Sequence, residues 1–301
     1  MPARVLDGSE IARTMRGELR ERVASMGRAG VPVTLDAVLT GDEDSPARLY
    51  AQNQQKQCEQ VGIRFRLHAL PSDASAGDIA GTIASLNNDA DVTGIMLHLP
   101  VPEGVDAYEL QRRIAPEKDI EGVNPSNIGN IVYGRSSLVP CTALAAMRLI
   151  EETGVRLRGK TAVVVGAGNV VGKPLAVLLM RAEATVISCN VHTPELGSLA
   201  TRADVLIAAA GVPRLVGPEL VREGAVVIDV GVNRIEQPDG SRMTCGDVDF
   251  EKVRESAGWI SPVPGGVGPV TVATLLSNAV EAAALASGAT PAEITPADPP
   301  N

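Results

Sequence analysis

Apolar residues recur at two different periods along the chain, and segments of the two kinds follow one another. Residues 11–26 carry apolar side chains at helical spacing, whereas residues 34–39 form a short apolar run that ends at polar residues. The pattern predicts helices at residues 11–26, 49–61, 108–114, 145–153, 174–181 and 271–286. It predicts strands at residues 34–39, 94–99, 161–165, 184–188, 205–210 and 225–230. This alternation indicates an α/β protein with parallel strands joined by helical crossovers.

The second half of the chain adds a glycine-rich loop to this alternation. The strand predicted at residues 161–165 leads into Gly-Ala-Gly-Asn-Val-Val-Gly at residues 166–172, and a helix follows. Gly166 permits a tight turn, Gly168 lacks the Cβ that would keep a pyrophosphate from the backbone, and Gly172 lets the helix pack closely on the strand. The loop predicts a dinucleotide site on a doubly wound parallel sheet. A tight turn that binds nothing is the alternative.

Length, composition and charge indicate a soluble globular protein of about two domains. The chain has 301 residues, of which 45% are hydrophobic and 21% charged. Its formal net charge is −9, and only 2% of its residues are aromatic. A nucleic acid needs a basic surface or stacking platforms, and an anionic membrane also attracts basic surfaces. We therefore expect no nucleic-acid partner and no membrane partner.

The cysteines and histidines predict neither a metal site nor disulfides. The 4 cysteines lack the spacing of zinc ligands, and the 3 histidines do not cluster with them. A chain of this length needs no disulfide, so reduced thiols are expected. No apolar run approaches the roughly 20 residues that cross a bilayer, and the N-terminus has no signal-peptide pattern. We expect a cytoplasmic protein with a flexible, proline-rich tail at residues 290–301.

A series of short motifs carries a family resemblance. In chain order they are Leu6-Asp7-Gly8, Pro140-Cys141-Thr142, Val171-Gly172-Lys173-Pro174, Asp229-Val230-Gly231-Val232-Asn233, Gly246-Asp247-Val248-Asp249 and the sequence Pro-Val-Pro-Gly-Gly-Val-Gly-Pro-Val-Thr at residues 262–271. With these motifs the chain closely resembles the bifunctional methylenetetrahydrofolate dehydrogenase/methenyltetrahydrofolate cyclohydrolase family. The resemblance extends over residues 3–285.

The resemblance implies two α/β domains with a cleft between them. Residues 1–139 would form an N-terminal folate and catalytic domain, joined by a returning helix at residues 271–286. Residues 140–270 would form a Rossmann-like dinucleotide-binding domain. The resemblance also implies a homodimer, a tetrahydrofolate derivative as substrate and a nicotinamide cofactor, which in this family is usually NADP.

Positions that carry the family's cyclohydrolase chemistry differ in this chain. The family has a tyrosine with a lysine four residues later, and this chain has Tyr50 followed by Gln54. Lys56 cannot replace that lysine, because two residues along a helix turn a side chain by about 200°. His98 stands where the family has glutamine, and Glu121 stands where it has aspartate. The candidate catalytic residues are therefore Tyr50, Gln54, His98 and Glu121.

The expected cofactor pocket differs as well. The resemblance assigns an arginine and a serine to the 2′-phosphate of NADP, and this chain has Ala167 and Val191 in their places. Asn190 also brings no positive charge, although Arg181 and His192 are near in sequence. These losses favour NAD over NADP, or the absence of a cofactor. By resemblance, the cofactor-binding residues are Thr142, Gly166, Ala167, Gly168, Val171, Asn190, Val191, Val232 and Thr271.

The expected substrate site includes two residues with open roles. By resemblance, the substrate-binding residues are Tyr50, His98, Leu99, Pro100, Glu121, Pro264, Gly265 and Gly266. His98 could fill the space of a glutamine and form a hydrogen bond, or it could act as a replacement base that titrates near neutral pH. Glu121 could contact the folate, or it could form a salt bridge at a hinge between the domains.

The changed residues predict the loss of one of the two family reactions. Hydride transfer from the folate to the nicotinamide needs alignment above all. Cyclohydrolysis needs proton transfer, and Gln54 cannot titrate. We expect an NAD-preferring 5,10-methylenetetrahydrofolate dehydrogenase with weak or absent cyclohydrolase activity. The alternatives are a rewired cyclohydrolase that uses His98 and a non-catalytic folate- or nucleotide-binding relic.

Overall fold

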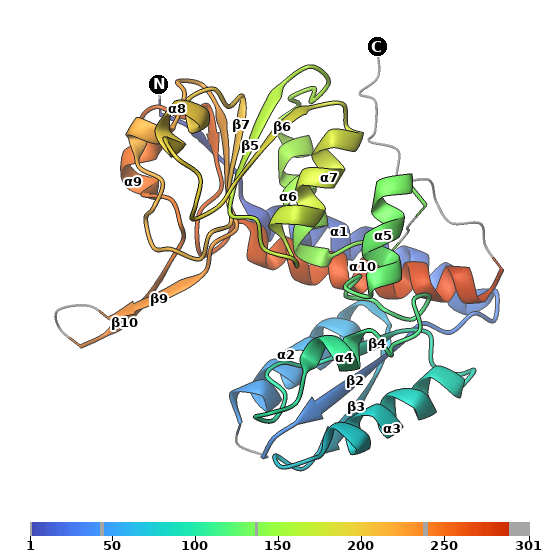
Figure 1. The fold of residues 1–301 in the computed structure, drawn as a ribbon. Helices are drawn as coiled ribbons and strands as arrows, with labels where there is room; N and C mark the ends of the chain where they lie inside the picture. Colours follow the sequence, from blue (N-terminus) through green and yellow to red (C-terminus); the bar gives the residue numbers. More distant parts are fainter. Residues whose placement is uncertain (1, 43–44, 136–137, 237–239, 289–301) are drawn as a thin grey trace. The chain divides into compact units, whose positions relative to one another are not determined.

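The computed structural model describes residues 2–42, 45–135, 138–236 and 240–288, which form two compact units (Figure 1). The six-stranded unit holds the described residues up to Arg13 together with Pro140–Thr274. The three-stranded unit holds Thr14–Val139 and the described residues from Leu275 onward. The boundaries fall inside α1 (Gly8–Arg28) and α10 (Val267–Ala286), so each of these helices belongs partly to both units.

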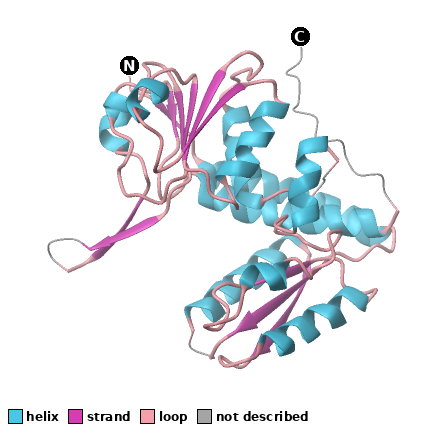
Figure 2. Ribbon diagram, viewed as in Figure 1, coloured by secondary structure: helices cyan, strands magenta, loops and turns pink. Residues whose placement is uncertain are grey.

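The three-stranded unit is a parallel sheet with the strand order β3-β2-β4. Its strands are β2 (Thr34–Thr40), β3 (Arg64–Leu70) and β4 (Ile95–Leu97), and its further helices are α2 (Pro46–Val61), α3 (Ala76–Asn88), α4 (Ala107–Gln111) and α5 (Pro125–Tyr133). The helices α2 and α3 lie on opposite faces of the sheet, as Figure 2 shows. Because both faces are covered, every residue of β2 is buried, as expected for a central parallel strand.

Polar caps fix where the helices of this unit begin. Ser45 precedes α2, and its side chain accepts a hydrogen bond from the backbone N–H of Arg48. Ser75 and Asp78 form a reciprocal capping box at the start of α3. Asn124 caps α5 by accepting from the N–H of Ser126. Each cap satisfies a backbone donor that the first turn of a helix leaves without a partner.

The six-stranded unit is a parallel sheet with the strand order β1-β11-β8-β7-β5-β6. Its strands are β1 (Arg4–Val5), β5 (Thr161–Val165), β6 (Thr185–Cys189), β7 (Val205–Ala208), β8 (Val226–Asp229) and β11 (Trp259–Ile260). The connecting helices are α6 (Cys141–Glu152), α7 (Gly172–Arg181), α8 (Leu196–Ala200), the 3₁₀ turn η1 (Pro218–Leu220) and α9 (Phe250–Val253). An antiparallel hairpin of β9 (Asn233–Glu236) and β10 (Arg242–Cys245) extends from this unit (Figure 1).

The structure confirms the predicted α/β class with parallel sheets, and most predicted elements are present within a few residues. The helix predicted at 108–114 is shorter, because α4 ends at Gln111. The strand β3 and the helix α3 lie in a stretch where the hydrophobic pattern predicted no element. Residues 290–301, predicted as a flexible tail, lie outside the described residues.

The first residues of the chain pack differently from the sequence-based expectation. That expectation placed residues 1–139 in one domain, whereas Arg4 and Val5 form β1 and pair with β11 of the six-stranded sheet. Ala3 also donates its backbone N–H to the carbonyl of Arg254. These edge-strand hydrogen bonds explain why residues up to Arg13 belong to the six-stranded unit.

The helix α10 combines length with an apolar composition. Among the described helices it alone is long and apolar enough to cross a membrane, yet more than half of that stretch is buried inside the protein. Thr274 and Asn278 are buried polar residues on it, and Asn278 donates to the carbonyl oxygens of Ile120 and Val139. These features are typical of a core helix.

Candidate active site

The carboxyl end of β4 brings together polar residues that the sequence singled out. The connection from β2 to β3 and the one from β3 to β4 run in opposite directions, so the strand order reverses between β2 and β4. Open α/β sheets bind ligands at the carboxyl ends of strands beside such a reversal. Tyr50 and Gln54 lie on α2, which begins soon after β2 ends, and His98 directly follows β4. With Glu121, they form what we call the polar cluster.

Gln54 is held in place by a hydrogen bond from its side-chain amide to β4. Its Nε2 donates to the sulfur of Met96 on β4 at 3.1 Å, and the residue is only 3% exposed. Its Oε1 is buried and has no hydrogen-bond partner among the described residues. Lys56, two positions further along α2, is exposed. The lysine and Gln54 therefore occupy different faces of the helix, as the sequence predicted.

His98 is a buried, neutral imidazole. The residue is 3% exposed, and its ring meets that of Tyr50 edge to face with 5.8 Å between the centroids. Burial lowers the pKa of His98 to about 4, because the protonated ring would lose its hydration. Its Nε2 has no hydrogen-bond partner within the described part of the chain. Such a ring is a weak base near neutral pH.

Glu121 reaches β4 from a loop that runs beside this strand. The N–H of Ile95 donates to the carbonyl of Lys118 at 2.7 Å, which aligns the loop with β4. The buried carboxylate of Asp119 shapes the following turn by accepting from the N–H groups of Gly122 and Asn124. The loop is thus fixed by contacts at both ends of the segment that carries Glu121.

The environment of Glu121 favours its neutral form. Burial, and to a lesser extent the charge of Asp119, raises the pKa of Glu121 to about 8, although the N–H of Leu97 opposes this shift. Its Oε2 is buried without a hydrogen-bond partner, and no ion pair involves Glu121 among the described residues. The structure therefore gives no support to the hinge salt bridge that was one alternative for this residue.

The unpartnered atoms of the polar cluster indicate a binding site. Gln54 Oε1, His98 Nε2 and Glu121 Oε2 are all buried without a partner in the described residues. Leaving such a group unsatisfied costs about 1–3 kcal/mol, so a ligand or water that bonds to these atoms is favoured. Tyr50 and Leu99 stand beside them and are about half exposed, at 50% and 53%.

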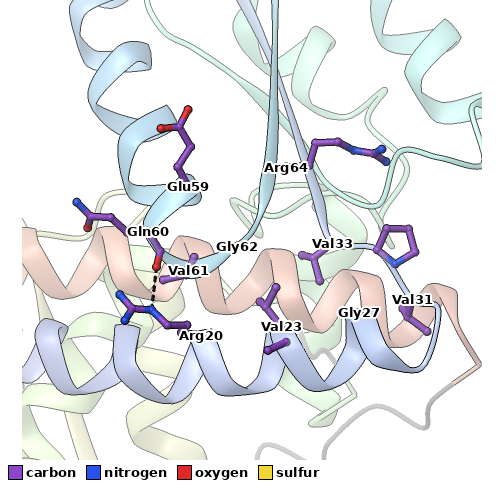
Figure 3. A pocket seen from close by; sticks show the side chains of 12 residues that line it. Arg20, Val23, Gly27, Val31, Val33, Glu59, Gln60, Val61, Gly62 and Arg64 are labelled. Atoms are coloured by element: carbon purple, nitrogen blue, oxygen red, sulfur yellow. Dashed lines mark hydrogen bonds between the residues drawn. The ribbon is translucent and has the colours of Figure 1, made fainter.

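A separate hollow lies at the opposite edge of the same sheet (Figure 3). It is lined by the second half of α1, the end of α2, and the residues that lead into β2 and β3. Arg20 donates to the carbonyl of Gln60 across it at 2.9 Å. Because this hollow borders the amino ends of the strands, it is distinct from the polar cluster at their carboxyl ends.

The glycine loop after β5 has the geometry that the sequence predicted. Gly166 has a φ of +112°, and a Cβ there would lie 2.2 Å from the carbonyl oxygen of Ala209. A Cβ on Gly172 would lie 1.9 Å from the oxygen of Gly166, so α7 begins in close contact with the loop. A Cβ on Gly168 would meet nothing within 4 Å among the described residues. The backbone at Gly168 is therefore open to a ligand.

The loop also lies at the reversal of strand order in the six-stranded sheet. The strand β5 has β6 on one side and β7 on the other, so consecutive connections leave it in opposite directions. Hydrogen bonds from the N–H of Gly166 to Cys189 and from the N–H of Ala209 to Val165 join these strand ends. A dinucleotide fits this position, with the glycine loop and the start of α7 facing its pyrophosphate.

Of the two basic residues that could contact a 2′-phosphate, His192 lies near the end of β6 and Arg181 lies at the far end of α7. Val191 is 92% exposed just after β6, and Asn190 accepts from the N–H of His192 in the same turn. Arg181 is the last residue of α7, which puts it about 13 Å along the helix from Gly172. Arg181 is therefore far from the loop, whereas His192 is exposed near the end of β6.

Most of the remaining predicted site residues lie in the six-stranded unit, and Pro100 lies in the three-stranded unit. Thr142 lies in the first turn of α6, Thr271 lies on α10, and Val232 is 69% exposed after β8. Gly266 is in contact with Gly8, where a Cβ would lie 1.8 Å from the Gly266 oxygen. Thus Pro264, Gly265 and Gly266 belong to the six-stranded unit, and the polar cluster belongs to the three-stranded unit.

Sequence reasoning missed two buried carboxylates at the carboxyl edge of the six-stranded sheet. Asp229 ends β8 and is 2% exposed, and Asp247 is fully buried. Burial, and more weakly the charge of Asp247, raises the pKa of Asp229 to about 7, against the effect of its backbone hydrogen bonds. Both residues stand in motifs that carried the family resemblance, which was the available signal for them.

The fold and these two sites define a class of protein. A doubly wound parallel sheet with a dinucleotide-type glycine loop, joined to a second α/β unit with a buried polar site, is typical of nicotinamide-dependent enzymes. Family patterns sharpen this assignment. The catalytic domain of the tetrahydrofolate dehydrogenase/cyclohydrolase family matches residues 6–121, and its NAD(P)-binding domain matches residues 140–287. The chain belongs to this family, which confirms the resemblance found in the sequence.

Individual relatives agree with the family assignment. The bifunctional protein FolD of Moorella thermoacetica is 44% identical over 94% of this chain and 99% of its own length. The bifunctional enzyme FolD from Campylobacter jejuni has a crystal structure that matches with a TM-score of 0.87 at 36% identity, covering 93% of this chain and 98% of that chain. FolD from Trypanosoma brucei, solved with NADP and an inhibitor, matches with a TM-score of 0.89 at 34% identity, covering 96% of this chain and 100% of that one.

Proposed function

We propose that this protein is an NAD-preferring 5,10-methylenetetrahydrofolate dehydrogenase with little cyclohydrolase activity. The observation that carries the proposal is the buried Gln54, which cannot titrate, in a chain that keeps the glycine loop of its family. The homologous bifunctional enzymes support the dehydrogenase reaction, and the changed side chains support its separation from hydrolysis.

The six-stranded unit would hold the cofactor. Residues of the glycine loop, with Asn190 and Val191 at the end of β6, would face its adenosine half, and Thr142, Val232 and Thr271 are proposed contacts elsewhere. The bound nicotinamide supplies a hydride acceptor at its C4. Ala167 and Val191 offer a 2′-phosphate neither charge nor hydroxyl, and a phosphate buried without partners is costly. This composition supports NAD over NADP.

The three-stranded unit would bind and orient the folate. Glu121 in its neutral form can donate a hydrogen bond as well as accept one, and Gln54 Oε1 can accept one. Loss of hydride leaves a cation that the folate's own nitrogens stabilise, so no protein base is required. The proposed role of these side chains is alignment, to which the reaction rate is sensitive. Leu99, Pro100 and residues 264–266 are proposed further substrate contacts.

Hydrolysis makes a demand that these residues meet poorly. A general base or acid works best when its pKa lies near the working pH. Glu121, with its pKa raised to about 8, meets this criterion, but it does not stand at the position of the family's lysine. Gln54, which stands there, has no such pKa. The pKa of His98 is lowered to about 4, and Lys56 is exposed on another face of α2. The missing titratable group at position 54 is therefore the reason to propose weak cyclohydrolase activity.

The experiment for this point is to restore the lysine. Gln54→Lys should raise the hydrolysis of methenyltetrahydrofolate by about 10²-fold, within the range typical of general acid–base catalysis. Gln55→Lys, which adds the same charge at an exposed neighbouring position, is the matched control and should leave hydrolysis unchanged. Brisk hydrolysis by the unchanged protein, abolished by His98→Gln, would instead establish the rewired cyclohydrolase.

Cofactor preference can be measured independently. Calorimetry with NAD and NADP should give the lower Kd for NAD, and the double variant with Ala167→Arg and Val191→Ser should shift the preference toward NADP. A clear preference of the unchanged protein for NADP would reject the argument and point to His192 as a phosphate contact. Thermal shifts provide the test against a non-catalytic relic, since a ligand at 100 times its Kd stabilises a protein by about 2.7 kcal/mol. No shift with NAD, NADP or a folate would favour the relic.

The wider setting of the enzyme is also part of the proposal. A homodimer in the cytoplasm, with no nucleic-acid or membrane partner, accords with the family resemblance and with the net charge of −9. Sedimentation equilibrium would test the dimer by giving twice the chain mass of 31.2 kDa.

A further inference from the structure

A buried carboxylate joins two loops at the carboxyl edge of the six-stranded sheet. Asp247 Oδ2 accepts hydrogen bonds from the N–H of Ala210 at 2.6 Å and of Gly211 at 2.8 Å, in the loop after β7. Its Oδ1 accepts from the side-chain amide of Asn233 at 2.8 Å, in the segment after β8. The side chain thus connects the ends of two neighbouring strands.

The carboxylate of Asp247 packs so closely against Gly231 that no side chain fits at that position. A Cβ on Gly231 would lie 2.1 Å from Asp247 Oδ1, so only glycine allows the segment after β8 to pass the carboxylate. Asp229 holds Asp247 from the other side, because its Oδ1 accepts from the backbone N–H of Asp247 at 3.0 Å. Asp229 also accepts from the N–H groups of Gly231 and Val248. The two carboxylates therefore fix both segments through many short contacts.

These two segments border the place where a dinucleotide fits. Ala209, directly before the Asp247-bound pair, has its carbonyl oxygen against Gly166 of the glycine loop. Val232, which lies between Gly231 and Asn233, is exposed and is a proposed cofactor contact. A dinucleotide in such a sheet lies across the strand-order reversal, with one half over β5 and β6 and the other over β7 and β8. The loops held by Asp247 follow β7 and β8, so they border the second of these halves.

We propose that Asp247 is a positioning residue that holds the loops after β7 and β8 in the arrangement that receives the nicotinamide half of the cofactor. This inference rests on the proposed function, because it requires a nicotinamide dinucleotide in the six-stranded unit. Asp247 acts through the backbone of Ala210 and Gly211 and through Asn233. Its role is to fix these groups before the cofactor binds, which lowers the cost of ordering them on binding.

The test is Asp247→Asn, which keeps the size of the side chain but replaces one acceptor oxygen by an NH₂ donor. That donor conflicts with the two N–H groups of the β7 loop unless it faces Asn233, whose amide must then turn over to accept from it. In either orientation the hydrogen bonds to the loop lose the charge of the carboxylate and become weaker. We expect the Kd for NAD, measured by calorimetry, to rise at least 10-fold. The Kd for 5′-AMP, which occupies only the adenosine half, should change less than 2-fold. In steady-state kinetics, the KM for NAD should rise more than kcat falls.

A matched control exists at the other edge of the same sheet. Asp204 precedes β7, and its carboxylate accepts from the N–H of Thr161 at 2.9 Å and from Arg222 at 2.7 Å. Asp204→Asn makes the same chemical change and should leave the affinity for NAD unchanged. If Asp247→Asn does not fold, Asn233→Ala releases only the segment after β8 and should raise the Kd for NAD by a smaller factor.

The outcomes separate this inference from the proposed function. If the unchanged protein binds neither NAD nor NADP, the proposed function fails. If the unchanged protein binds NAD and Asp247→Asn binds it within 2-fold, the positioning role alone is wrong. An equal loss of affinity for NAD and for 5′-AMP would also overturn it, because a general structural defect would then explain the effect.

Discussion

The glycine loop after β5 and the polar cluster at the end of β4 are held in place by opposite means. In the loop, backbone atoms approach so closely that a Cβ on Gly166 or Gly172 would lie about 2 Å from a carbonyl oxygen, at 2.2 and 1.9 Å. In the polar cluster, buried side-chain atoms lack partners altogether, as at Gln54 Oε1 and His98 Nε2 in the described part of the chain. The shape of the loop is therefore fixed by the protein's own atoms, whereas the cluster keeps buried polar atoms that a ligand could bond.

This difference explains which positions tolerate change. The loop's shape is tied to the fold, so its outer glycines cannot change without moving the backbone. We expect the polar cluster to tolerate the exchange of side chains of comparable volume, because its unpartnered atoms belong to side chains and not to the backbone. Gln54, His98 and Glu121, which we expect from the resemblance to differ from the family pattern, occupy such positions. Family chemistry can therefore change at the cluster while the fold of both units is kept.

The largest effect is expected at Gly172. Gly172→Ala places a Cβ 1.9 Å from the Gly166 oxygen, and the backbone must move to relieve the clash. We expect a loss of about 3 kcal/mol or more in the free energy of unfolding, measured by urea titration. The control is Gly17→Ala in α1, which meets nothing within 4 Å among the described residues and should be neutral or slightly stabilising. Equal stability of both variants would show that the loop can relax around the added methyl group. The glycine loop would then be as tolerant of change as the polar cluster.

The next effect concerns the ionisation of Glu121. Because the pKa of Glu121 is raised to about 8 in the folded protein, the native state keeps a proton that the unfolded state has lost above its ordinary pKa of 4.5. Stability conferred by this group is full below about pH 4.5 and is lost as the pH rises toward 8. Between pH 6 and 8, the unchanged protein should lose on the order of 2 kcal/mol relative to Glu121→Gln.

Urea titrations of both proteins at several pH values would measure that difference. Subtracting one series from the other removes the contribution of other groups that titrate in this range, such as Asp229, whose pKa is raised to about 7. A constant difference between the two proteins from pH 6 to 8 would mean that Glu121 is ionised in the folded state. The polar cluster would then carry a negative charge. It could no longer be described as a neutral site with unpartnered atoms.

A smaller effect is expected at Gly168, on the loop side of the comparison. Gly168→Ala adds a methyl group that meets no described residue, so the thermal midpoint should stay within about 1 °C of the unchanged protein. The same methyl group should keep a pyrophosphate from the backbone and raise the Kd for NAD about 10-fold, which corresponds to about 1.4 kcal/mol. An unchanged Kd would place the pyrophosphate away from Gly168.

The smallest effect is expected at His98. The folded protein keeps the ring neutral down to a pKa of about 4, whereas the unfolded chain takes up a proton near the ordinary value of 6.5. The unchanged protein should therefore lose on the order of 1 kcal/mol relative to His98→Gln as the pH falls from 6.5 to 5.5. At pH 7.5 the two should respond alike to small pH changes. If the difference does not vary between pH 6.5 and 5, the ring is accessible to protons in the folded state.

The fold could be predicted from the sequence wherever local signals and tertiary structure agreed. The strand β5, the glycine loop and α7 form one continuous signal of apolar run, glycine spacing and helix. The strand β3 has no continuous apolar run. Its residues 64–68 instead alternate between polar and apolar side chains, which is the pattern of a half-buried strand and was missed by the prediction. The side chains of Arg66 and His68 both contact the carboxylate of Asp36 on the neighbouring β2, at 2.7 Å each. A partner across the sheet is invisible to a pattern that runs along the chain.

The site divides in the same way. Tyr50 and Gln54 share one helix, so their spacing alone predicted a common face, and the structure places both beside β4. The contact of Glu121 with the N–H of Leu97 depends on how the loop around Asp119 folds back along that strand. The hydrogen bonds from Ala210 and Gly211 to Asp247 join residues that are still further apart along the chain. Sequence reasoning identified the chemical groups, and tertiary contacts determined which of them are neutral, buried or structural.

The division of the chain into two units has a consequence for how the protein is made. The six-stranded unit needs β1 from the first residues as well as Pro140–Thr274, and the three-stranded unit needs the part of α10 that begins at Leu275. During synthesis on the ribosome, residues 14–139 emerge early but wait for α10 before their unit is complete. Both units therefore finish within about one helix length of each other. Cutting the gene at residues 139 and 140 would yield two incomplete halves rather than two independent domains.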